Sequence, residues 1–224
     1  MYLPAAFHET RIEVMHGLMR SHPLAMLITG GERGLDASPL PFLIHAGEGE
    51  FGTLRAHMAR ANPHWQALQD APECLVVFQG EQGYVTPSWY PTKQATHKVV
   101  PTWNYATVHA WGRPRVIEEA LWLRQLLEDL TRAQEGRRAQ PWNVGEAPAD
   151  FIEAQMRAII GIEISIGRIE GKWKMSQNRP AADQAGVVAG LRAGDDVHRN
   201  AVMAEMVADR CFTQGPVGST MPKR

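Results

Sequence analysis

The spacing of hydrophobic and polar residues changes repeatedly along the chain, and each change marks an expected element. Residues 10–21 place Ile12, Met15 and Met19 at helical spacing, and Pro23 follows the expected end of this helix. Alternating apolar and polar residues, or short apolar runs bounded by turn residues, predict strands. The expected strands are 24–29, 40–45, 51–58, 74–79 continued by 83–87, 104–116 and 160–169.

The second half of the chain adds helices to this pattern. Residues 118–134 carry a broad apolar stripe that predicts a strong helix, and further helices are expected at 149–158, 181–191 and 196–208. Residues 92–98 are expected to form an irregular loop. About six short strands interrupted by helices favour a mainly β, α+β fold with a closed or half-closed antiparallel barrel over a doubly wound sheet.

Composition and charge narrow the class of protein. Hydrophobic residues make up 44% of the 224 residues, which is enough for a real core. The 23 basic and 24 acidic side chains leave a net charge of −1, so the charge does not support DNA binding by phosphate neutralisation. The chain shows neither a secretion signal nor an apolar run of membrane-spanning length, so we expect a cytoplasmic protein with no membrane partner.

Familiar catalytic motifs are absent from the sequence. It has no GxSxG elbow, no GxxxxGK[ST] phosphate loop and no GxGxxG after a strand. Cys74 and Cys211 have neither the spacing of a disulfide framework nor that of a zinc site. Hydrolase, kinase and metalloenzyme functions are therefore disfavoured, and no metal ligands are expected.

Two segments combine hydrogen-bonding, cationic and aromatic residues more densely than a core requires. They are residues 100–105 (VPTWNY) and 174–179 (KMSQNR), the latter preceded by Trp173. A flat, phosphorylated ligand needs such a mixture of groups. Ser176 or Asn178 could instead cap the helix that follows, and for that segment taken alone capping is the simpler interpretation.

Residues 53–62 carry possible phosphate ligands. Thr53, Arg55 and His57 share one face of an expected strand, and Arg60 and Asn62 follow. An arginine offers two parallel hydrogen bonds to a phosphate, and the other side chains add single bonds. A solvated strand face gives the same spacing and is the more common explanation.

A second strand face could contact a ring system. Tyr105, Thr107, His109 and Trp111 point the same way, and His109 could donate to a ring nitrogen. An aromatic-rich dimer interface explains the pattern equally well, and both can hold when a cofactor lies between protomers. The pair at 97–98, His-Lys, is either an anion contact or part of a solvated loop.

Several of these segments together resemble a known family. They are residues 61–65 after His57, 77–80, 84–90, 100–105 with 108–109, and 174–179. In this order they resemble the PaiB family, bacterial proteins described as FMN-binding negative transcriptional regulators. The resemblance spans about residues 1–210.

The resemblance implies a split β-barrel of the FMN-binding type, related to the pyridoxamine-phosphate oxidases. The barrel would occupy residues 1–179 with a helical insertion at about 118–158, C-terminal helices at 180–210 would pack on it, and 211–224 would form a flexible tail. Two protomers would form a homodimer with FMN in the cleft between them.

The resemblance also suggests cofactor contacts. Arg55, His57 and Arg60 would meet the phosphate and ribityl chain, residues 102–109 the ring, and Gln177 and Arg179 would reach across from the partner subunit. The full expected set is Thr53, Arg55, His57, Arg60, Asn62, Lys98, Trp103, Asn104, Tyr105, Thr107, His109, Gln177 and Arg179.

Three functions follow as hypotheses. The first is an FMN-binding, PaiB-like negative transcriptional regulator, acting directly on DNA or through a partner. The second is an FMN-dependent oxidoreductase that acts on a small molecule. The third is a haem-binding split-barrel protein, with His57 or His109 as axial ligand.

Overall fold

The computed structural model describes residues 1–31 and 34–213, and the chain forms two compact units. The central unit contains Arg11–Gln79 and Val108–Glu170. The terminal unit contains Met1–Thr10, Gly80–Thr107 and Gly171–Arg224, of which 171–213 are described. Of the expected flexible tail, 211–213 end a short π-helix at Asp209–Thr213, and 214–224 lie outside the described residues.

The described residues form an antiparallel sheet with the strand order β3-β2-β6-β7-β8-β5-β4, and β1 pairs with β8. This path runs from β3 to β4 without closing on itself. The strands are β1 (His8–Glu9), β2 (Leu24–Gly31), β3 (Gly34–Pro41), β4 (Leu43–His45), β5 (Thr53–Ala59), β6 (Cys74–Val85), β7 (Thr102–Ile117) and β8 (Ile159–Lys174). Each of β6, β7 and β8 contributes residues to both units.

Strand alternation builds the core of the central unit. Leu54 lies opposite Ile164, and Met58 lies opposite Ile160, in the antiparallel register of β5 with β8. These side chains are buried, as is Ala56 between them. Because successive residues of a strand point to opposite faces, the same register leaves Thr53, Arg55 and His57 on the other face.

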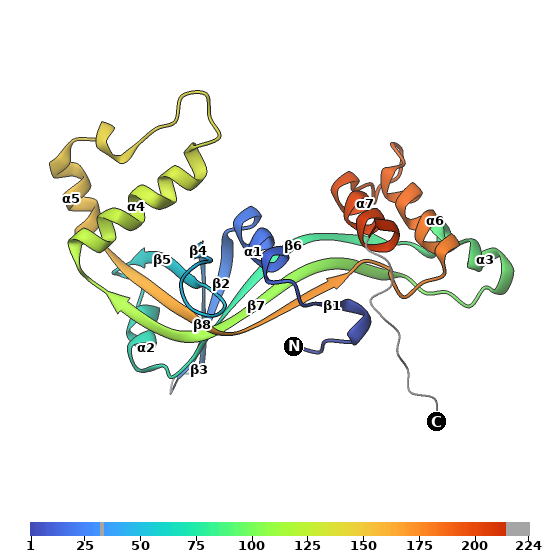
Figure 1. Cartoon of the computed structure of the whole chain (residues 1–224), viewed down its shortest axis with the longest axis horizontal. Coiled ribbons are helices and arrows are strands. Elements are labelled where there is room, and N and C mark those ends of the chain that lie inside the picture. Colours follow the sequence, from blue (N-terminus) through green and yellow to red (C-terminus); the bar gives the residue numbers. More distant parts are fainter. Residues whose placement is uncertain (32–33, 214–224) are drawn as a thin grey trace. The chain divides into compact units, whose positions relative to one another are not determined.

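Helices connect the strands (Figure 1). The α-helices are α1 (Ile12–Ser21), α2 (His64–Asp70), α3 (Pro91–Thr96), α4 (Ala120–Glu135), α5 (Ala149–Arg157), α6 (Ala181–Arg192) and α7 (Ala201–Ala208). Short 3-10 turns lie at Ala5–Phe7, Pro87–Trp89 and Val144–Glu146. The predicted α+β class with an inserted pair of helices and C-terminal helices is confirmed.

Two local expectations were wrong. The expected loop at 92–98 contains α3, because Pro91 occupies the first helical position, where its fixed φ favours a helix. The expected strand at 40–45 is interrupted at Phe42, and β3 begins earlier, at Gly34. Pro39 and Pro41 argue against a central strand, but β3 lies at the end of the strand order, where proline is tolerated.

The insertion between β7 and β8 has a small apolar core of its own. Leu123 of α4 packs with Val144, Ile152 and Met156. The neighbouring Trp122 ring lies so close to Gly161 that a Cβ there would fall 2.3 Å from it. A glycine is therefore required in β8 for α4 to lie against the strand.

The terminal unit is closed by α6 and α7, which pack side by side around Leu191 and Met203 (Figure 1). A Cβ at Gly190 would fall 2.3 Å from the Trp89 ring, so this glycine lets α6 approach the Pro87–Trp89 turn. Among the described residues, no helix combines the length and the apolar character needed to cross a membrane.

A buried ion pair links the two ends of the terminal unit. Arg210 donates to the Glu9 carboxylate at 2.6 Å, and the two side chains are 8% and 2% exposed. Removing one partner of a buried pair leaves an uncompensated charge and typically costs about 3–5 kcal/mol.

We expect Arg210→Met to lower the free energy of unfolding by about 3–5 kcal/mol in urea titrations followed by circular dichroism. The matched control is Arg192→Met, which removes an exposed arginine paired with Glu205 and should cost less than about 1 kcal/mol. Equal losses of unfolding free energy in the two variants would show that the buried pair contributes no more to stability than the exposed pair.

Candidate functional site

The end of β8 carries two lysines on one strand face. Lys172 donates to the Tyr2 carbonyl at 3.0 Å, and its ammonium lies 5.4 Å from the centre of the Tyr105 ring. Lys174 donates to the Thr102 hydroxyl and, at 2.5 Å, to the Trp103 carbonyl. These contacts hold both ammonium groups beside the first residues of β7.

Arg179 adds a third positive charge just after the strand. Its guanidinium lies 4.8 Å from the centre of the Tyr90 ring. Burial lowers the pKa of Lys174, and the charges of Arg179 and Lys172 lower this pKa further. We call Lys172, Lys174 and Arg179 the cation cluster. Among the described residues, no carboxylate lies within ion-pair distance of any of the three, so the cluster favours an anion.

A constrained turn positions Arg179. Ser176 has a φ of 62°, which is uncommon for a residue with a side chain. Its hydroxyl and the buried Asn104 amide exchange hydrogen bonds of 3.0 and 3.2 Å, and its carbonyl accepts from the Arg179 N–H. Gln177 folds back on the same turn, accepting from the Met175 N–H and donating to the Trp173 carbonyl.

The capping interpretation of this segment was wrong. Helix α6 begins at Ala181 with Pro180 as its N-cap, and no side chain caps it. Ser176 bonds instead to Asn104, from a strand far away in the sequence, so local spacing could not reveal its partner.

Aromatic rings stand beside the cation cluster. The Trp103 ring is 53% exposed and meets the Tyr84 ring edge-on, with centroids 5.8 Å apart. The other neighbour of Tyr84 is His198, at 4.6 Å between centroids. The exposed Trp103 indole provides a flat apolar surface, and the backbone carbonyl of Trp103 bonds to Lys174 of the cation cluster. This donor set fits a flavin phosphate.

Of the expected cofactor residues, the structure brings together Trp103, Asn104, Tyr105 and the turn with Gln177 and Arg179. Thr107 is buried in β7, and Lys98 is exposed beyond α3. Lys172 and Lys174 were missing from the expected set. Their signal is the spacing of Lys172 and Lys174, which places two cations on one face of β8.

The expected phosphate face in the central unit is charge-balanced. Arg55 donates at 2.8 Å to Glu163 and at 2.8 Å to Glu48, and Arg115 also donates to Glu163. Arg60 forms an ion pair with Glu118 at 2.7 Å. A phosphate would have to compete with these carboxylates for both arginines.

The remaining expected residues of the central unit serve other contacts. Thr53 donates to the Glu48 carbonyl, and Asn62 donates to the Ser38 hydroxyl. The His109 ring lies against Trp111, with centroids 5.5 Å apart.

The Nδ1 atom of His57 is buried without a hydrogen-bond partner among the described residues, and burial lowers the pKa of this histidine. No cluster of three or more potential metal ligands occurs in the described part of the chain. The haem hypothesis stays a prediction.

The chain is similar to a known family and to known proteins. Residues 1–168 match the family described as "Putative FMN-binding domain". An uncharacterized protein of Emericella nidulans is 37% identical over 226 residues, covering 85% of this chain and 90% of that protein. The "Protease synthase and sporulation protein PAI 2" of Bacillus subtilis is 27% identical, covering 96% of this chain and all of that protein. These matches confirm the resemblance to the PaiB family and the expectation of FMN as that family's cofactor.

A solved structure confirms the split-barrel fold. The FAD and haem binding protein of Mycobacterium smegmatis superposes with a TM-score of 0.56 at 20% identity, covering 75% of this chain and 73% of that one. At this identity the likeness concerns the fold alone.

The buried His64 provides a pH-dependent test of the central unit. Its ring nitrogens bond to the hydroxyls of Thr29 (2.7 Å) and Ser38 (2.8 Å). Burial lowers the pKa of His64 from its ordinary 6.5, partly opposed by Asp36. Between the lowered pKa and 6.5 the unfolded chain binds more protons, so stability is full above pH 6.5 and falls as the pH drops below it.

We expect the free energy of unfolding to decline on acidification below about pH 6.5, and His64→Asn to flatten this slope. Urea titrations at several pH values measure it. His97→Asn, which alters an exposed histidine at a left-handed position that suits asparagine, should keep the original slope. An unchanged slope in His64→Asn would contradict the assignment.

Proposed function

Because this chain belongs to the family of FMN-binding domains, we propose that it is a flavoprotein that holds the FMN phosphate at the cation cluster. The observation that carries this proposal is a set of three neighbouring cations with no carboxylate partner among the described residues. Lys174 and Arg179 would hold the phosphate, and the exposed Trp103 ring offers a wall for the flat ring system. Bound FMN supplies hydride or single-electron transfer.

The expected face of β5 is the less favourable phosphate position. Arg55 already bonds to two carboxylates, and bringing a dianion beside Glu48 and Glu163 would add repulsion. No carboxylate among the described residues forms an ion pair with the cation cluster. The pKa of Lys174 is lowered by burial and, further, by the charges of Arg179 and Lys172, a repulsion that a bound anion would relieve.

Comparing FMN with riboflavin isolates the phosphate contact, because the two ligands differ only in that group. We expect the native protein to prefer FMN, and Lys174→Met to reduce this preference at least about tenfold, the scale of a lost charged hydrogen bond. Quenching of flavin fluorescence measures both affinities. The control Lys93→Met removes a half-buried lysine of the same unit, whose ammonium bonds to the Ser88 hydroxyl, and should leave the preference intact.

A preference that survives in Lys174→Met but is lost in Arg55→Met would move the phosphate to the central unit. A protein that binds neither flavin would overturn the proposed function itself.

The bound flavin could serve either gene regulation or redox catalysis. The resemblance to the PaiB family supports a negative regulator of gene expression, and the Bacillus subtilis relative is named for protease synthesis and sporulation. Arg192 of α6 bonds to Glu205 of α7. Because the carboxylate neutralises this arginine, Arg192 does not form part of a basic surface for DNA recognition. We therefore propose regulation through a partner protein, with the chain as a homodimer. The second candidate is the FMN-dependent oxidoreductase, which the match to the FMN-binding family supports.

One preparation of FMN-loaded protein separates these roles. For an indirect regulator we expect no shift of promoter DNA at 50 or 150 mM salt, because 24 acidic residues offset the 23 basic residues that could neutralise phosphates. For an oxidoreductase we expect NADH or NADPH to bleach the flavin absorbance under anaerobic conditions. Sedimentation of the same sample tests the homodimer, and a salt-sensitive DNA shift would contradict indirect regulation.

A further inference from the structure

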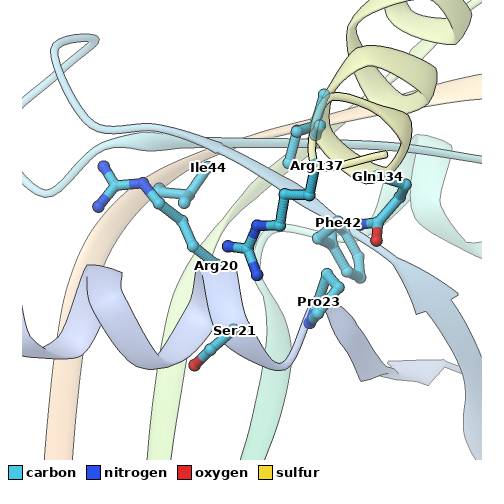
Figure 2. Close-up of a pocket in the computed structure, with 9 residues that line it drawn as sticks. Arg20, Ser21, Pro23, Phe42, Ile44, Gln134 and Arg137 are labelled. Carbon is cyan, nitrogen blue, oxygen red and sulfur yellow. The ribbon is translucent and has the colours of Figure 1, made fainter. Parts of the chain in front are cut away.

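A pocket in the central unit has no role in the proposed flavin site. It lies where the end of α1, the start of β4 and the end of α4 meet, and its volume is about 320 Å³ (Figure 2). The residues that matter for its chemistry are Arg20, Pro23, Phe42, Ile44, Gln134 and Arg137.

Two arginines enter this pocket from different elements. Arg20 belongs to the last turn of α1, and Arg137 follows the end of α4. Figure 2 shows Arg137 descending from the helix end toward Pro23, and Arg20 extending from α1 toward Ile44 on the other side of the pocket. Within the part of the chain that the structure describes, neither forms an ion pair.

The arginines within α4 and just after it behave differently from Arg137. Arg124 pairs with Glu128, Arg132 pairs with Asp129, and Arg138 pairs with Glu135. Arg137 is thus left without a carboxylate although its neighbour Arg138 has one. A helix C-terminus favours a cation beside it, which accounts for one arginine at each helix end. It does not by itself account for two arginines that line one pocket with no carboxylate partner among the described residues.

The rest of the pocket is apolar or neutral. Pro23, Ile44 and the edge of Phe42 form an apolar surface, and Phe42 is itself fixed edge-on to Phe78 with centroids 6.1 Å apart. Gln134 adds an amide that can donate or accept. The pocket thus combines an oxyanion-binding pair with a small apolar surface, which suits an amphipathic anion more than an inorganic ion.

We propose that this pocket is a second ligand site, which binds a small organic oxyanion with its charged group between Arg20 and Arg137 and its apolar body against Pro23, Phe42 and Ile44. The charged group is a phosphate or a carboxylate, since both accept paired hydrogen bonds from a guanidinium. The site is independent of the cation cluster and does not require the chain to bind FMN.

Isothermal titration calorimetry of the full-length protein with four probe ligands tests the site. Phenyl phosphate and benzoate carry both an oxyanion and a ring, inorganic phosphate carries the anion alone, and benzyl alcohol carries the ring alone. We expect one or both ring-bearing anions to bind more tightly than the two partial probes. Binding of phenyl phosphate alone identifies a phosphate ligand, and binding of benzoate alone identifies a carboxylate.

Variants then place the binding at the pocket. Arg20→Gln and Arg137→Gln should each weaken the ring-bearing anion at least about tenfold, the scale of a lost charge-assisted pair. The matched control Arg138→Gln removes the adjacent, carboxylate-paired arginine and should change the affinity by less than about twofold. Arg137→Lys keeps the charge but loses the planar fork, and should give an intermediate affinity.

Three results would overturn the proposal. They are no binding of any ring-bearing anion, equal weakening by Arg138→Gln, or loss of binding in Lys174→Met with retention in both pocket variants. The last result would assign the anion to the cation cluster. This conclusion would hold whether or not the protein binds FMN. Chemical shifts of the Arg20 and Arg137 side-chain N–H groups on titration provide an independent readout, and shifts confined to other residues would also count against the site.

Discussion

Compensation of charge is the constraint that organises the polar groups of this protein. In the central unit, Arg55 and Arg60 each contact a carboxylate, and Glu163 accepts from both Arg55 and Arg115. In the terminal unit the deeply buried Arg210 is matched by Glu9. Buried charges are tolerated when they are paired, because desolvation is otherwise far more costly than the gain from packing. The cation cluster is informative because it departs from this rule.

The departure is supported by the surrounding structure. Lys172 is almost fully buried between the rings of Tyr2 and Tyr105 and donates to a backbone carbonyl, so its position is fixed although no carboxylate meets it. Lys174 is fixed by two acceptors of β7. Long flexible cations lose conformational entropy when they are held in this way. Ordering them in advance lowers the cost of binding an anion, which is a property of a ligand site rather than of a solvated surface.

The sequence predicted the periodic elements well and the partners of polar groups poorly. The apolar stripe at 118–134 appears as α4, and the alternation at 51–58 appears as β5, because each pattern depends on neighbours in the sequence. The edge strand β3 was missed in part because its prolines argue against a central strand. The location of a strand at the end of a sheet is a property of the whole fold, and no local window contains it.

In the candidate site, too, the sequence indicated the residue types but not their partners. Residues 100–105 and 174–179 stood out by composition, and the structure joins them through Asn104 and Ser176. Arg55 stood out equally, but its partners Glu48 and Glu163 lie 7 and 108 residues away along the chain. Whether an arginine is available to a ligand depends on such distant carboxylates. Spacing identifies residues that can bind phosphate, and only the fold shows which of them are already engaged.

The N-terminal segment connects the stability of the terminal unit to its chemistry. Strand β1 pairs with the end of β8 so that His8 lies opposite Lys172 and Glu9 lies opposite Gly171. Glu9 also holds Arg210, whose guanidinium bonds to the His8 carbonyl as well. The strand that carries Lys172 is therefore fixed on one side by a segment that is itself anchored by a buried ion pair. Disturbing that pair should loosen the lysine and the Tyr2 carbonyl that orients it, although Arg210 lies outside the cation cluster. The position of one lysine of the cation cluster thus depends on an ion pair whose two residues lie outside the cluster.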